Sequence, residues 1–156
     1  MARQLFLVVC LSLGACRKAP TAQPRFCDQD LSGLWVNSSD KSFAYTFRDD
    51  GGLIRGEFAV RAEDGGLTKL PEPITLELKR TDAAIAGVMR SKDKTAGGKS
   101  CPVEYEIKVS DCKPDVLQVV AEVSAPVGDD CKRLSAPDGG AFPPDLREFR
   151  LERLRR

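Results

Sequence analysis

Thiols are the side chains of this sequence with the widest choice of chemistry, because a cysteine can be acylated, oxidised to a disulfide or bound to a metal. The chain has six cysteines and no histidine. The absence of histidine removes the commonest general base, every histidine-containing metal site and the usual catalytic triads. The last four cysteines form no C-x-x-C pair and are irregularly spaced, which does not favour a zinc site. They are Cys27, Cys101, Cys112 and Cys131.

Two pairs of adjacent carboxylates are the other groups that could do acid–base chemistry. Asp49-Asp50 is followed by two glycines, a pattern typical of a hairpin turn. Asp129-Asp130 lies in a stretch rich in proline and glycine, where a solvated loop is expected. Neither pair comes with a partner base, a nucleophile or metal-ligand spacing. We therefore expect no enzyme activity, no catalytic residue, no cofactor and no metal.

The N-terminus has the composition of an export signal. A short basic start, residues 1–4, precedes an apolar run from Leu5 to Leu13, and the small residues Gly14-Ala15 follow, as signal cleavage requires. The apolar run is about ten residues long, against the ~20 that a transmembrane helix needs. An ordinary secretory signal cut after Ala15 would leave Cys16 as a free thiol.

The small-small-Cys ending resembles the lipobox of bacterial lipoproteins. The resemblance implies that residues 1–15 are a removed signal peptide and that Cys16 carries acyl chains such as palmitate, which anchor the protein in a bilayer. Residues 16–25 would then be a lipidated N-terminus and a flexible tether. In well-studied Gram-negative lipoproteins an aspartate after the cysteine favours the inner membrane. Arg17 stands there instead, which favours the outer membrane.

Residues 26–156 are expected to form a single β domain. Apolar residues alternate with polar ones in most segments, and turn residues separate the segments. A formal charge of +1 with mixed signs gives no reason to expect nucleic acid as a partner. The expected strands lie near 34–36, 43–47, 54–60, 74–78, 83–90, 103–109, 117–123 and 149–153.

Eight strands in succession predict an up-and-down antiparallel barrel. A β-sandwich is the main alternative. Residues 146–154 also fit a short C-terminal helix, but we favour a strand because it closes the sheet. Successive connections of such a barrel alternate between its two ends, so strand order assigns each cysteine to an end. In an exported protein this predicts the disulfides Cys27–Cys112 and Cys101–Cys131.

The start of the domain resembles the first conserved block of the lipocalins, within the wider calycin group. The resemblance rests on Gly33-x-Trp35, with Phe26 seven residues before the glycine and Leu31 two before it. It implies a helical plug and an eight-stranded barrel. The family's second block, Thr-Asp-Tyr, corresponds to Ser110-Asp111-Cys112, where cysteine replaces the tyrosine. Its third block has an arginine that packs over the tryptophan, for which Arg150 and Arg153 are both candidates.

Two functions are compatible with such a barrel. In the first, the interior is a cavity that binds a small apolar ligand or lipid. In the second, the interior is packed and the outer surface binds an envelope protein, as an interaction or assembly module. We expect loops 62–72, 91–100 and 125–144 to form the contact surface in either case. The candidate cavity-lining residues are Trp35, Phe43, Tyr45, Phe47, Phe58 and Tyr105.

Overall fold

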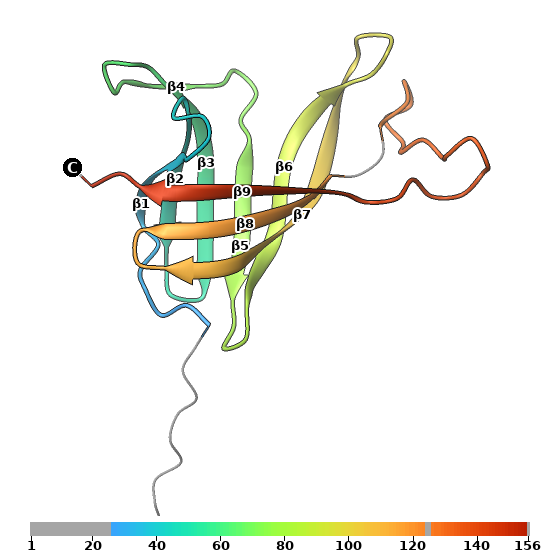
Figure 1. Cartoon of the computed structure of the whole chain (residues 1–156). Coiled ribbons are helices and arrows are strands. Elements are labelled where there is room, and N and C mark those ends of the chain that lie inside the picture. The colour runs from blue at the N-terminus through green and yellow to red at the C-terminus, as the bar shows by residue number, and fades with distance from the viewer. Residues whose placement is uncertain (1–25, 124–125, 156) are drawn as a thin grey trace, which may run out of the picture.

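The computed structural model describes residues 26–123 and 126–155. The expected signal peptide (1–15), Cys16 and the tether lie outside these residues. The described residues form one antiparallel sheet of nine strands, shown in Figure 1. The strands are β1 Gly33–Asn37, β2 Phe43–Asp49, β3 Leu53–Arg61, β4 Leu67–Lys69, β5 Thr75–Arg80, β6 Ile85–Lys94, β7 Ser100–Lys113, β8 Val116–Val123 and β9 Asp145–Arg153.

Eight of these strands close into a barrel, as the sequence predicts. Each barrel strand pairs with the next along the chain, and β1 pairs with β9 to complete the ring. Trp35 stands opposite Arg153 in this closing pair. The C-terminal segment is therefore a strand, and the expected alternatives of a sandwich and a C-terminal helix are wrong. The short strand β4 is the ninth strand and pairs only with β3.

Two strands are longer than their apolar pattern indicates. β6 continues to Lys94 and β7 begins at Ser100, so most of the expected loop 91–100 is a hairpin that projects beyond β5 (Figure 1). The alternation continues there with polar residues on the inward side, since Ser91 pairs with Val103 and Asp93 with Cys101. β7 also extends past a bulge through Cys112, which the sequence places in a turn.

Both predicted disulfides are present. Cys27 and Cys112 are joined at one end of the barrel, with Cα atoms 5.8 Å apart. Cys101 and Cys131 are joined at the other end, with Cα atoms 5.3 Å apart. The first end, here called the closed end, holds the tight turns and residues 26–32, which form no helix, so the helical plug that the resemblance implies is wrong. The second end, here called the open end, holds the long loops.

Two glycines let the barrel wall close tightly. The ring of Phe47 lies over Gly56 on the neighbouring strand, within 2.6 Å of the place where a Cβ would stand. Gly87 of β6 lies against the backbone of β5, and a Cβ there would meet the Glu77 carbonyl oxygen and lie 2.9 Å from Leu78 Cα. Only glycine fits where a backbone passes this close.

We predict that Gly87→Ala destabilises the barrel by about 3 kcal/mol, because the added methyl must displace backbone rather than a flexible side chain. Urea unfolding of the purified protein measures the change. Gly52→Ala is the matched control, since Gly52 is exposed and has nothing within 4 Å of its added Cβ. That control is expected to stay within about 0.5 kcal/mol of the parent. Equal effects at the two positions would contradict the packing described here.

Candidate ligand-binding site at the open end

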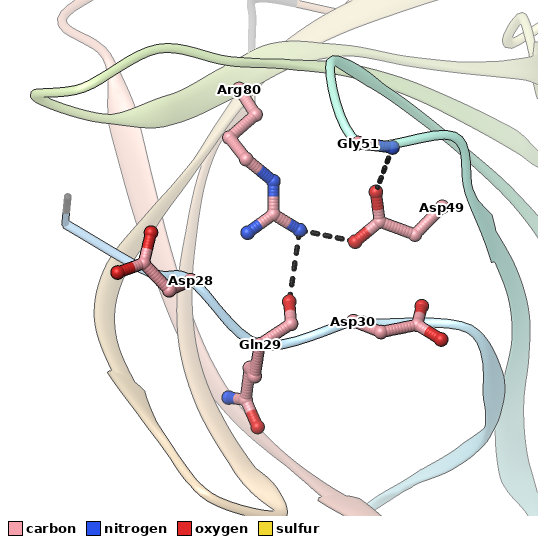
Figure 2. A pocket seen from close by; sticks show the side chains of 6 residues that line it. All are labelled: Asp28, Gln29, Asp30, Asp49, Gly51 and Arg80. Carbon is pink, nitrogen blue, oxygen red and sulfur yellow. Dashed lines mark hydrogen bonds and ion pairs between the residues drawn. The ribbon is translucent and has the colours of Figure 1, made fainter.

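A buried ion pair seals the closed end of the barrel. Arg80, at the end of β5, pairs with Asp49, at the end of β2, and their side chains are only 6% and 2% exposed. The Arg80 guanidinium also donates to the carbonyl oxygens of Cys27 and Gln29, the latter at 3.1 Å. Figure 2 shows Arg80 reaching across to Asp49 and to the backbone at Gln29. Arg80 therefore fastens residues 26–32 beneath the barrel.

Both oxygens of the Asp49 carboxylate, including the one that pairs with Arg80, also accept hydrogen bonds from backbone amides. One oxygen accepts from the Leu31 amide at 2.9 Å, and the other accepts from the Gly51 amide at 2.8 Å. The hollow at this end, drawn in Figure 2, has a volume of only about 180 Å³. In residues 26–123 and 126–155 no group of three or more Cys, Asp or Glu side chains is placed to hold a metal ion. The hollow at the closed end is therefore a poor candidate for a ligand site.

Trp35 forms the floor of the barrel interior. Its ring is fully buried, and its Nε1 donates to the Leu31 carbonyl at 2.8 Å. The Arg153 guanidinium lies 4.6 Å from the centre of the ring and donates to the Ser32 carbonyl at 3.1 Å. Of the two candidate arginines, Arg153 is the one that packs over the tryptophan. Arg150 is exposed and pairs with Glu152 at 3.4 Å.

Aromatic rings fill the middle of the interior. Tyr45 stacks between Phe47 and Phe149, with ring centres 6.2 Å away on each side. Its edge contact with Phe58 has a centre-to-centre distance of 5.4 Å. Burial raises the pKa of Tyr45 to about 12. Four of the six predicted cavity-lining residues therefore fill the middle of the barrel with ring contacts: Trp35, Tyr45, Phe47 and Phe58.

The two other predicted residues lie nearer the open end. Phe43 contacts the edge of Phe58 and is 43% exposed. Tyr105, on the opposite wall, is buried, and its hydroxyl donates to the Asp93 carboxylate. Burial, followed by this hydrogen bond, raises the pKa of Tyr105 well above its usual range. The hydroxyl therefore stays protonated at neutral pH and remains a donor to Asp93.

A larger cavity, here called the mouth cavity, lies at the open end and has a volume of about 560 Å³. Asp93, Val123, Asp145 and Arg147 contribute to it from β6, β8 and β9, on the face that continues the barrel interior. The opposite wall comes from the loop between β8 and β9 and is mainly apolar. This loop contributes Pro126, Val127, Leu134, Phe142 and Pro143. The β6–β7 hairpin contributes Lys94 and Ala96.

Contacts with the β6–β7 hairpin hold the loop wall in place. The Cys101–Cys131 disulfide joins the two segments, and the Thr95 hydroxyl donates to the Asp129 carboxylate. Lys99 Nζ donates to the Asp129 carbonyl at 2.7 Å. These covalent and polar contacts form the wall without help from a ligand. Because the wall is already formed, less conformational entropy is lost when a ligand binds.

Cys131 stands in a backbone conformation that favours glycine. Its φ is 62°, and it occupies the same turn position that Gly65, Gly98 and Gly139 occupy in three other open-end turns. A non-glycine residue in this region is unfavourable by about 1 kcal/mol or more. The disulfide accounts for a cysteine at a position otherwise suited to glycine.

The sequence indicated the region of the mouth cavity but not its residues. The sequence predicts a contact surface in loop 125–144, and this loop supplies most of the apolar wall. The sequence does not point to Asp93 or Arg147, because its pattern predicts a shorter β6 and an apolar inward face for β9. One feature of the sequence does, however, indicate Asp93. It lies an even number of residues after Met89, so both side chains fall on the inward face if the strand continues.

The fold and the site define an eight-stranded antiparallel barrel that is plugged at one end and has a ligand-sized cavity at the other. Comparison with protein-family models, with curated proteins and with solved structures finds no match. In the part of the chain that the structure describes, no helix is long and apolar enough to cross a membrane.

We predict that Arg80→Met destabilises the protein by about 3–5 kcal/mol, because it leaves the Asp49 carboxylate buried without its counter-charge. Urea unfolding again provides the measurement. Arg55→Met is the control, since Arg55 pairs with Asp50 at 3.0 Å on the exposed surface. Exposed pairs contribute about 0–1 kcal/mol. Comparable losses in the two variants would show that the closed end does not depend on Arg80.

Proposed function

We propose that this chain is a bacterial envelope lipoprotein whose barrel binds a small apolar ligand or lipid in the mouth cavity. The observation that carries the ligand part is the mouth cavity itself: about 560 Å³, with Val127, Leu134 and Phe142 on its apolar wall. Ligand sites for small molecules typically have volumes of about 300–1,000 Å³, with mainly apolar walls and a small number of polar groups that orient the ligand. The packed aromatic rings below it confine the ligand to the open end.

The anchor part of the proposal rests on the sequence around Cys16. Acylation there would fix the protein to a bilayer, and Arg17 after the cysteine favours the outer membrane. Residue 26 begins the described domain at the closed end, where its amide donates to the Asp82 carbonyl at 3.0 Å. A tether that leaves from this end would turn the mouth cavity away from the membrane. This arrangement supports a ligand that arrives from the aqueous side.

A second function is favoured by the packed interior. Tyr45, Phe47, Phe58 and Phe149 fill the middle of the barrel with ring contacts, which is what a solid-core interaction or assembly module requires. In that case the open-end loops would contact an envelope protein. The two functions differ in one observable property, because only the first places a small molecule in the purified protein.

We predict that the full chain carrying Cys16→Ser, purified from a bacterial envelope, retains an apolar mass in native mass spectrometry, and that organic extraction removes it. Phe142→Asp should lower the occupied fraction several-fold, because it places a charge on the apolar wall. Leu146→Asp is the control, since Leu146 is 60% exposed on β9 and does not line the mouth cavity. A protein that is empty in every preparation would favour the interaction module.

For the anchor, we predict that cells expressing the full chain incorporate a palmitate analogue into it, and that Cys16→Ser abolishes the label. The unlabelled variant should move from the membrane fraction to the soluble envelope fraction. Cys10→Ser is the control and should leave labelling intact, because Cys10 lies within the expected signal peptide. Labelling that persists in Cys16→Ser would contradict acylation at this residue.

A further inference from the structure

The mouth cavity contains one carboxylate, that of Asp93, that forms no ion pair with a Lys or Arg side chain among the residues that the structure describes. Asp93 lies on the inward face of β6, opposite Cys101, and its carboxylate accepts a hydrogen bond from the neutral Tyr105 hydroxyl. We propose that this carboxylate is the recognition group for a ligand that carries a cationic head on an apolar tail. The proposal rests on the proposed function, because it specifies the ligand of the same cavity.

The other charges of the mouth cavity leave Asp93 as the acceptor for such a head. On β9 the Arg147 guanidinium is already paired with Asp145, with Nε 3.1 Å from the carboxylate. Lys94 also lines the mouth cavity, but it follows Asp93 directly along β6, so its side chain starts on the opposite face of the strand. The charges of Arg147 and Arg133 are near enough to act on the Tyr105 hydroxyl, but within residues 26–123 and 126–155 neither they nor any other Lys or Arg forms an ion pair with the Asp93 carboxylate.

The position of Asp93 makes an added cation favourable. Its side chain is half-buried beside an apolar wall, where a lone charge is less well solvated than in water. The Tyr105 hydroxyl occupies one carboxylate oxygen and fixes its orientation, which leaves the other oxygen for a charge-assisted hydrogen bond. An ammonium at this oxygen would be neutralised while its tail covered Leu134 and Phe142. A carboxylate head would instead be repelled by Asp93.

The experiment compares three probes that share a decyl chain: decylammonium, decanoate and uncharged 1-decanol. Binding to the full chain carrying Cys16→Ser is measured by calorimetry, below the micelle concentration and at low salt. We expect decylammonium to bind about tenfold more tightly than the other two, and this advantage to shrink at high salt. Asp93→Asn should remove the advantage and leave 1-decanol binding unchanged.

Asp64→Asn is the matched control. Asp64 accepts from the Gly66 amide at 2.8 Å in an exposed turn away from the mouth cavity, and asparagine can accept the same bond. Its thermal unfolding and its preference for decylammonium should match the parent. If the three probes bind equally, or if Asp93→Asn keeps the preference, the charge proposal fails and the proposed function stands. If no probe binds, both fail together.

Discussion

The ion pair between Arg80 and Asp49 is the interaction on which the arrangement of this barrel depends. Two charges are removed from water, and the desolvation is offset only because the guanidinium also meets backbone carbonyls and the carboxylate meets two backbone amides. Through these contacts the segment 26–32 becomes a plug, and the Cys27–Cys112 disulfide fixes it further. With one end sealed and the aromatic rings above Trp35 packed, the open end is where the barrel offers a ligand-sized cavity.

The open end is built differently from the closed end. There the strands of the β6–β7 hairpin extend past their neighbours, and the loop after β8 folds against them through the Cys101–Cys131 disulfide and the Thr95–Asp129 hydrogen bond. The result is a cavity with a strand wall that carries charge and a loop wall that is apolar. An amphiphilic ligand would match these two walls. Its proposed cationic head would face the charged strand wall, and its apolar tail would face the loop wall.

The fold was predictable because the apolar residues of most strands alternate along the chain and the turns between them are short. Strand order then placed each cysteine at one end, and both disulfides followed. The mouth cavity was not predictable in the same way. Ser91 and Asp93 put polar groups on the inward face of β6, so the apolar alternation ends before the strand does. The contact of Asp129 with Thr95 joins residues that are 34 positions apart in the sequence. Sequence patterns report local periodicity, whereas such contacts depend on the finished barrel.

The most direct test is methyl NMR of the protein during titration with decylammonium, with assigned signals from both ends of the barrel. We expect the methyl signals of Val127 and Leu134 to shift in proportion to occupancy, while those of Leu117 and Leu151, buried in the core cluster with Trp35, stay in place. Shifts confined to the core methyls would show that the ligand enters the middle of the barrel, and would contradict a binding site at the mouth.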